Sequence, residues 1–272
     1  MSPSRYPDWD SFEFPAAAGG DSAAGADSPV AFSADLSPAS LLAAYRRGIV
    51  PLPAPDEFFR GLNEIRYEDR VASGAIALVG DERTDPYWAG WWSPDPRPLV
   101  GAADVHLGRN VRKRLRRDNL STTANADFQR VAEACRAGRE PRWLTDRLLG
   151  SLAELHAAGW AHSIEVWLGD DLVGGARGIG ISTLISGDSL FGRHPGAAAV
   201  AVADLGARLA AAGGTVIDAQ WDSPFLRSLG AEAVPRERYL KLLAESLASG
   251  PPEPVPLAGG RLPARRLLAP LA

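Results

Sequence analysis

The chain has 272 residues, a net charge of −4, 46% hydrophobic residues and 23% charged residues, which is an ordinary composition for a globular protein. No apolar run approaches the roughly 20 residues that span a bilayer, and the N-terminus lacks the basic and apolar regions of a signal peptide. The single cysteine, Cys135, excludes an internal disulfide framework, and the four histidines have no metal-ligand spacing. These observations predict a cytoplasmic protein without a metal site or a membrane partner.

The chain begins with a segment that has little to bury. Residues 1–28 are rich in Ala, Gly, Ser and Asp, which predicts a disordered or loosely attached arm. Ser37 and Pro38 have the residue types of an N-cap and a first helical position, and they predict a helix that runs to Gly48. Residues 56–86 show no clear hydrophobic period, and no element is predicted there.

A strand is predicted at Gly101–Leu107, and a strongly basic segment follows it. Six cations fall within the nine residues Arg109–Arg117, where only Val111 and Leu115 are apolar. This spacing predicts a helix with a thin apolar seam and basic residues around the rest of it. A solvated basic face is one interpretation, but six cations without interleaved acids favour contact with phosphates.

The middle of the chain predicts two helices and a hairpin. One helix covers 126–137 and has an apolar face, and Thr145 caps a second helix that ends at Gly159. Two strand-like runs, 161–168 and 172–179, flank a Gly-Asp-Asp turn and predict a β-hairpin.

Residues 182–220 combine regular elements with unexpected polar side chains. The order predicted here is a strand at 183–186, a glycine-bounded polar patch at 187–193, a helix at 197–212 and a strand at 215–220. Asp218 and Gln220 lie two residues apart on the last strand, so they are expected to point to the same face. Burying this pair costs free energy unless it has partners, which makes it a candidate site. The alternative is a structural pair that ties down a neighbouring loop.

The C-terminal part predicts a short helix from 222 or 223 to Gly230 and a last helix from Pro235. Residues 249–272 are rich in Pro and Gly and predict a tail. From residue 100 onward, the order of elements favours the α+β class. It suits the acyl-CoA N-acyltransferase architecture (GNAT-like), a mixed sheet that is split near its centre.

Eight motifs, collinear over about residues 35–245, resemble the leucyl/phenylalanyl-tRNA–protein transferase family. They are Trp91–Arg97, Trp143–Thr145, Gly159–Trp167, Asp171–Gly175, Gly187–Phe191, Ile217–Gln220, Ser228–Ala231 and Pro235–Tyr239. The resemblance implies a small N-terminal domain at 29–98 and a GNAT-like transferase domain at 99–248, between the arm and the tail. Residues 54–86 form an insertion, because the family has a much shorter connection there.

The resemblance implies transfer of an aminoacyl group from charged tRNA to the α-amine of a protein that begins with Arg or Lys, without metal or dissociable cofactor. Asp218 and Gln220 match the catalytic strand positions, and Asp188 matches a carboxylate that helps to hold the cationic acceptor. Trp143 matches the aromatic residue that stacks on the 3′-terminal adenosine. The basic helix matches the region that grips the acceptor stem through its phosphates, which implicates Arg109, Arg112, Lys113, Arg116 and Arg117.

The chain departs from the family at positions that face the substrate. The second adenosine-facing tryptophan is Leu52, the tyrosine after Trp143 is Leu152, and the start of the helix at 197 is Gly196–Ala199 instead of Asn-Ala-Ser-Lys. The aminoacyl pocket is expected to be aliphatic, lined by Ala176, Ile185, Leu190, Val202 and Leu205. These changes predict a different aminoacyl group or a different acceptor, which could be a small amine. The enzyme is expected to be a monomer.

Two alternatives come from other classes of function. Arg193–Ala198 fits the Arg-x-x-Gly-x-Ala loop that cradles the pyrophosphate of CoA at a helix N-terminus, which would indicate a CoA-dependent N-acyltransferase. The altered pocket would also suit a non-catalytic relative that binds tRNA or peptide.

Overall fold

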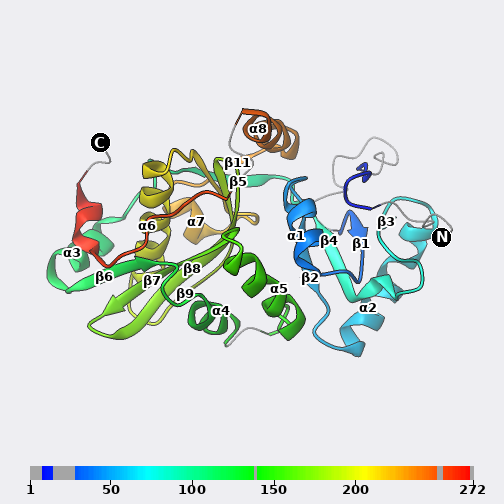
Figure 1. The fold of residues 1–272 in the computed structure, drawn as a ribbon, viewed down its shortest axis with the longest axis horizontal. Coiled ribbons are helices and arrows are strands. Elements are labelled where there is room, and N and C mark those ends of the chain that lie inside the picture. Colours follow the sequence, from blue (N-terminus) through cyan, green and yellow to red (C-terminus); the bar gives the residue numbers. More distant parts are fainter. Residues whose placement is uncertain (1–7, 15–27, 138–139, 250–253, 270–272) are drawn as a thin grey trace. The chain divides into compact units, whose positions relative to one another are not determined.

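The structure is a computed structural model, which describes residues 8–14, 28–137, 140–249 and 254–269 (Figure 1). The chain divides into two compact units, residues 1–95 with 139–152, and residues 96–138 with 153–272. The described residues form eight α-helices and two mixed sheets, which confirms the α+β class. None of the helices in these ranges combines the length and hydrophobicity needed to cross a membrane.

The first unit contains a four-stranded sheet in the order β2-β4-β1-β3. Its strands are β1 (Ala31–Phe32), β2 (Val50–Pro53), β3 (Ala77–Leu78) and β4 (Ala89–Trp92). Helix α1 (Pro38–Tyr45) begins after Ser37, whose side chain accepts a hydrogen bond from the Ser40 amide, as the sequence predicts. The segment 54–86 forms α2 (Glu57–Ala72), β3 and the start of a 3₁₀ turn, η1 (Pro86–Trp88).

Part of the predicted N-terminal arm packs against this sheet. Trp9 and Phe12 are buried, and the ring centroid of Trp9 lies 4.6 Å from that of Trp91 in β4. Residues 8–14 are therefore attached to the first unit through an aromatic cluster, whereas the composition of residues 1–28 predicts a disordered or loosely attached arm. Residues 1–7 and 15–27 of the arm lie outside the described residues.

The second unit contains an eight-stranded sheet in the order β11-β5-β10-β9-β8-β7-β6-β12. Its strands are β5 (Arg97–Gly101), β6 (Leu120–Ala124), β7 (Ala161–Leu168), β8 (Asp171–Ile181), β9 (Leu184–Gly192), β10 (Val216–Asp218), β11 (Glu232–Val234) and β12 (Leu262–Pro263). Its helices are α3 (Arg109–Arg117), α4 (Phe128–Arg136), α6 (Ala197–Ala211), α7 (Pro224–Ser228) and α8 (Arg236–Ser249), and α5 (Asp146–Ala157) contains residues of both units.

Helices α6 and α4 cover opposite faces of this sheet (Figure 1). A Cβ added to Gly174 would lie 2.5 Å from the Cβ of Ala197 in α6, whereas a Cβ added to the next residue, Gly175, would lie 3.2 Å from Val131 in α4. Successive residues of a strand point to opposite faces, so Gly174 and Gly175 show which face of the sheet each residue of β8 lies on. Even-numbered residues there face α6, and odd-numbered residues up to Arg177 face α4.

Pairing between β9 and β10 ends near the middle of the sheet. The two strands run parallel and pair from Val216–Leu184 to Asp218–Ser186, where β10 ends. β9 continues to Gly192 and pairs there only with β8 among the described strands. The sheet therefore separates beyond Asp218 on the β10 side of β9.

Three predicted boundaries differ from the structure. Residues 102–107 lie outside any strand because a turn follows β5, in which the amide of Asp104 donates to the carbonyl of Gly101. The strand begins instead at Arg97, before the predicted start at Gly101. The polar patch at 187–193 is largely strand, since Leu184–Gly192 is continuous β9.

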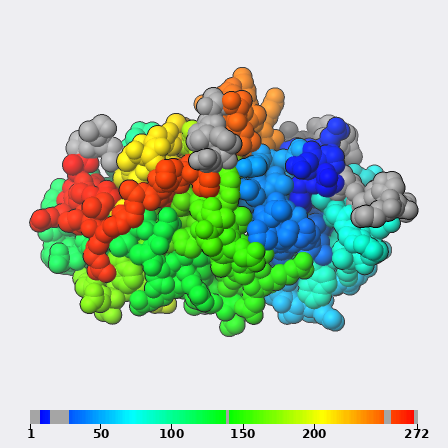
Figure 2. Space-filling model, in the orientation of Figure 1, coloured from blue at the N-terminus to red at the C-terminus, as the bar shows by residue number. Residues whose placement is uncertain are grey.

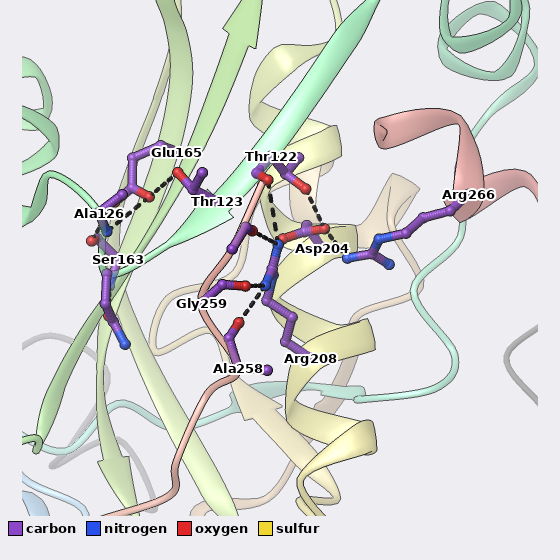
Figure 3. A network of polar contacts seen from close by, with 12 residues as sticks. Thr122, Thr123, Ala126, Ser163, Glu165, Asp204, Arg208, Ala258, Gly259 and Arg266 are labelled. Atoms are coloured by element: carbon purple, nitrogen blue, oxygen red, sulfur yellow. Dashed lines mark hydrogen bonds and ion pairs between the residues drawn. The ribbon is translucent and has the colours of Figure 1, made fainter. Parts of the chain in front are cut away.

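The C-terminal segment 254–269 packs on the second unit, where it is drawn in red (Figure 2). β12 pairs with β6, and the 3₁₀ helix η2 (Ala264–Leu268) follows it. Arg208 of α6 donates to Asp204 over 2.6 Å and to the carbonyls of Ala258, Gly259 and Gly260, and Arg266 of η2 also pairs with Asp204 (Figure 3). The part of the predicted tail that the structure describes, 254–269, is thus fixed by a buried polar network, and residues 250–253 and 270–272 lie outside the described residues.

Candidate active site

The candidate site is centred on Asp218, the last residue of β10, which is completely buried. Arg97 donates from Nε and from Nη2 to the two carboxylate oxygens, each over 2.7 Å. Ser186 Oγ donates to Oδ2 over 2.7 Å, and Tyr239 Oη donates to the same oxygen over 3.1 Å. Leu99 of β5 and Ser186 of β9 pair with Asp218 in register, and Arg97 lies two residues from Leu99 on β5.

These contacts keep Asp218 ionised in spite of its burial. Burial alone works to raise the pKa of Asp218, but the charge of Arg97 and hydrogen bonds from Arg97, Ser186 and the Gln220 amide hold that pKa below its usual range. Burial and the charge of Asp218 raise the pKa of Tyr239, whose ring lies 4.4 Å from the Arg97 guanidinium. The site therefore contains a fixed carboxylate and a neutral phenol.

Gln220 does not lie on the strand, so the expected i, i+2 placement on one face is wrong. β10 ends at Asp218, and Gln220 has a left-handed backbone with φ of 60°. Its backbone amide instead folds back and donates to Asp218 Oδ1 over 2.9 Å. The turn is stabilised by the carboxylate itself, and Gln220 as a whole is only 3% exposed.

Ser186 connects the two side chains that the sequence singles out. The Gln220 amide donates from Nε2 to Ser186 Oγ over 3.1 Å, and Ser186 donates in turn to Asp218. The order is therefore amide, hydroxyl, carboxylate, and this leaves the Gln220 carbonyl oxygen as the end of the chain. A hydrogen-bond chain of this kind polarises its terminal group.

Asp188 lies on β9 two residues beyond Ser186 and forms a buried ion pair. Arg177 Nη1 donates to Asp188 Oδ2 over 2.9 Å, and the two side chains are 1% and 3% exposed. The predicted acceptor-binding carboxylate thus already has a cationic partner from the neighbouring strand.

The expected pocket residues gather on the opposite, α6 side of the sheet. All five belong to one apolar cluster, and of these five only Leu190 is partly exposed: Ala176, Ile185, Leu190, Val202 and Leu205. Ile185 pairs with Ile217, directly before the position where β9 and β10 separate.

The predicted tRNA-binding residues lie on two different units. In α3, Arg109, Lys113, Arg116 and Arg117 are exposed, whereas Arg112 is half-buried and donates to the carbonyl of Leu268. Leu115 is buried as the apolar seam, which confirms the predicted helix. Trp143 is half-buried in the segment that leads into α5 and belongs to the first unit.

Three residues of the site were not assigned a role from the sequence: Arg97, Ser186 and Tyr239. Two of them, Arg97 and Tyr239, lie inside motifs that resemble the family, and Ser186 directly precedes such a motif. A signal was therefore present, but only the pairing of the strands and the packing of α8 bring these residues to Asp218. In the described parts of the chain, no group of three or more His, Cys, Asp or Glu residues could hold a metal ion.

Residues 99–244 match the family described as leucyl/phenylalanyl-tRNA protein transferase. The leucyl/phenylalanyl-tRNA–protein transferase of Teredinibacter turnerae is 36% identical over 232 residues, which cover 84% of this chain and 78% of the relative. The proteins of the same name from Saccharophagus degradans and Novosphingobium aromaticivorans are 34% and 35% identical, covering 82% and 86% of this chain and 81% and 77% of the relatives. The chain belongs to the leucyl/phenylalanyl-tRNA protein transferase family.

Proposed function

We propose that this protein is an aminoacyltransferase that moves an aminoacyl group from charged tRNA to an acceptor amine. The observation that carries the proposal is the buried chain from Arg97 through Asp218 and Ser186 to Gln220, in a member of this family. The acceptor is a protein N-terminus or a related amine, and the reaction takes place in the cytoplasm without a resident cofactor.

In this proposal, Gln220 positions the attacking amine. Its carbonyl oxygen accepts a hydrogen bond from the neutral amine, which attacks the ester carbonyl of the aminoacyl-tRNA. The new C–N bond forms, the ester C–O bond breaks, and the proton leaves the amine for the 3′ oxygen of the tRNA. Since the aminoacyl ester is already activated, orientation of the amine supplies much of the rate enhancement.

Asp218 and Ser186 act through Gln220. The Asp218 carboxylate accepts a hydrogen bond from the Ser186 hydroxyl, and this hydroxyl accepts one from the Gln220 amide nitrogen. Both bonds polarise the amide, so its oxygen gains negative charge. Arg97 and Tyr239 hold the carboxylate in one orientation, because both donate to it. These residues are positioning residues, whereas Gln220 is the one that touches the substrate.

A split, GNAT-like sheet suits this chemistry. Where β9 and β10 separate, Asp218 lies on one face of the sheet, and the apolar cluster lies on the other face, which α6 covers. An aminoacyl side chain that passes through this separation reaches Ile185 and Leu190 while its ester stays beside Gln220. The GNAT-like domain at 99–248 and the small N-terminal domain at 29–98 are part of the same proposal.

The pocket proposal has a direct test in Ala176. This residue is 4% exposed in the apolar cluster, and a larger side chain would fill space that an aminoacyl group needs. Ala176→Met should narrow the range of side chains that are transferred, by about 1–3 kcal/mol for each methylene that no longer fits. If the ranking of charged tRNAs is unchanged, Ala176 does not line the pocket.

CoA-dependent acyl transfer is a weaker candidate. At the start of α6, the amide of Ala197 is already used by the carbonyl of His194, and Asp118 lies 3.3 Å from the His194 ring. A carboxylate at a helix N-terminus competes with a bound pyrophosphate instead of attracting it.

The experiment is a transfer assay with a panel of aminoacyl-tRNAs and peptide acceptors. The expected result is labelled aminoacyl-peptide with at least one charged tRNA, and strong loss of it in Gln220→Ala. Acyl transfer from acyl-CoA but from no aminoacyl-tRNA would favour the CoA-dependent alternative. Tight binding of tRNA with no transfer to any acceptor would indicate a non-catalytic relative.

A further inference from the structure

Arg177 has a buried hydrogen-bonding edge that nothing in the described protein uses. Of its guanidinium nitrogens, Nη1 donates to Asp188, but Nε and Nη2 have no hydrogen-bond partner although the side chain is 1% exposed. A buried donor without a partner costs roughly 1–3 kcal/mol, and more when it is charged, so each such group needs an explanation.

The same chain shows what this edge of an arginine can bind. Nε and Nη2 of Arg97 hold both oxygens of Asp218 over 2.7 Å, in a bidentate arrangement. The corresponding two nitrogens of Arg177, Nε and Nη2, have no hydrogen-bond partner. The planar fork of arginine matches a carboxylate, so the two side chains present the same recognition element.

A third unused donor lies next to this edge. Ser189 is paired directly with Arg177 across β8 and β9, and its buried Oγ also has no hydrogen-bond partner. Residues that are paired in register point to the same face of a sheet. Three buried donors therefore converge where a single anionic group would satisfy them.

This place lies on the same face of the sheet as the proposed catalytic chain. Arg177 is two residues from Ile179, whose partner on β9 is Ser186, and Ser186 is paired with Asp218. The register between β8 and β9 shifts between Arg177 and Gly178, which makes Asp188 the extra residue of a bulge. β8 and β10 are two strands apart, a distance of about 10 Å. An acidic residue of the acceptor can therefore reach Arg177 with its carboxylate while its amine lies near Gln220.

We propose that Arg177 and Ser189 bind a carboxylate of the acceptor, so that the preferred acceptor carries an acid close to its reactive amine. The inference rests on the proposed function and names the substrate class of its acceptor site. Asp188 is paired with Arg177 and serves to fix the guanidinium, and the Nε–Nη2 edge is left for the substrate. A cationic acceptor terminus would meet an arginine here instead of a lone carboxylate.

The test compares peptides that differ only in their first residue: Glu, its uncharged isostere Gln, and Arg. For the wild-type protein, kcat/KM should be about tenfold or more higher with Glu than with Gln, as expected for a charge-assisted hydrogen-bonded pair, and lowest with Arg. Free glutamate forms a further arm, which distinguishes a small-molecule acceptor from a protein N-terminus.

Arg177→Lys is the matched variant, since it keeps the charge beside Asp188 but has no planar edge. It should lower the Glu-to-Gln ratio, mainly through the KM of the peptide, because an ammonium still attracts a carboxylate but cannot bind it in the bidentate geometry. The double variant Arg177→Met with Asp188→Asn removes both charges, leaves no lone buried ion, and should bring the ratio close to one. Circular dichroism and thermal unfolding confirm that each variant is folded.

Four results would overturn the inference. They are a wild-type preference for Arg peptides, equal use of Glu and Gln peptides, an unchanged Glu-to-Gln ratio in Arg177→Lys, and variants that change the KM of the tRNA instead of the peptide. The first two would leave the proposed transferase function standing. Calorimetric binding of the Glu and Gln peptides without tRNA tests the site separately: equal affinities would reject it even if no transfer were detected.

Discussion

Gln220 has a backbone conformation that residues with a Cβ adopt infrequently. Its φ of 60° costs of order 1–3 kcal/mol when the surroundings impose it, and such residues concentrate at functional sites. Here the hydrogen bond from its amide to Asp218 imposes the turn, and its side chain turns back to Ser186. The strained residue is also the one whose side chain ends the polar chain, which is the arrangement expected of a preorganised amine-binding group.

Single and double substitutions should show that the three residues act as a unit. Ser186→Ala interrupts the chain without removing the carboxylate or the amide, and it should lower kcat more than it raises KM. Asp218→Asn combined with Gln220→Ala should be little worse than Gln220→Ala alone, because both act through one oxygen. Rates measured under single turnover check this, and fully additive losses would show that the residues work independently.

His162 should make stability depend on pH. Burial, aided by the nearby charge of His156, lowers the pKa of His162 to about 4 from an ordinary value of 6.5. Between these values the unfolded chain binds a proton that the folded protein does not, so stability falls as the pH drops from 6.5 to about 4. The loss amounts to roughly 3 kcal/mol.

His162→Gln should remove that pH dependence, as urea unfolding at about pH 7 and about pH 4.5 would measure. His156→Gln, at the more exposed of the two histidines, serves as the comparison. An equal fall in stability between the two pH values in wild type and His162→Gln would assign the effect to other groups.

At the level of single residues, the sequence predicts Asp218 and Gln220 but not how they are connected. Local spacing identifies two polar residues near a buried strand, yet Arg97 lies 121 residues from Asp218 and Ser186 lies 32 residues away. Partners at such separations are set by strand pairing, on which local periodicity carries no information. The predicted shared strand face fails because a side-chain hydrogen bond ends β10 two residues early.

At the level of elements, α3 is a short helix with several exposed cations. Arg109, Lys113 and Arg116 are exposed, and only Leu115 is buried. If this helix binds acceptor-stem phosphates, tRNA affinity should fall steeply with salt. Removing one phosphate-binding cation should then flatten the log–log slope by about 0.7–0.9.

Lys113→Gln with Arg116→Gln should therefore reduce the slope by up to about 1.8 in filter-binding titrations. Arg238→Gln with Lys241→Gln is the matched control, because it removes two exposed cations at the same spacing on α8. A slope that changes only in the control pair would move the phosphate contact to α8.

Elements with a clear local pattern are predicted well. β7 spans the predicted residues 161–168, and α4 and α6 begin and end within two residues of their expected bounds. The apolar residues of α4 recur with the helical period, whereas α6 is an alanine-rich, buried run bounded by glycines. β6 and β12 were not predicted, since they are short and gain their stability from neighbours that are distant in sequence. β5 begins earlier than predicted because its first residues lie in a proline-rich segment, which lacks the pattern of a strand.

At the level of the whole molecule, the C-terminal segment contributes to the core of the second unit. Val255, Leu257 and Ala264 belong to the same apolar cluster as α6, and Arg208 binds the carbonyls of this segment. Arg208→Met should lower the free energy of unfolding by about 3–5 kcal/mol, because it removes a buried, hydrogen-bonded charge from Asp204.

Arg261→Met provides the control for that loss. Arg261 lies in the same segment, and its side chain is 47% exposed while it donates to the carbonyl of Gly169. Removing it should cost no more than about 1 kcal/mol. Equal effects of the two substitutions on chemical denaturation would mean that the segment is held by its apolar residues alone.

The position of β5 in the sheet has a consequence for synthesis of the protein. β5 pairs with β10 and β11, which are made more than a hundred residues later. At roughly 5–20 residues per second, a ribosome needs about 6–24 s to add the 121 residues from Arg97 to Asp218. Throughout that interval the nascent chain carries an arginine without its carboxylate and a strand without either neighbour. The cell must keep this strand from pairing elsewhere until the last quarter of the chain emerges.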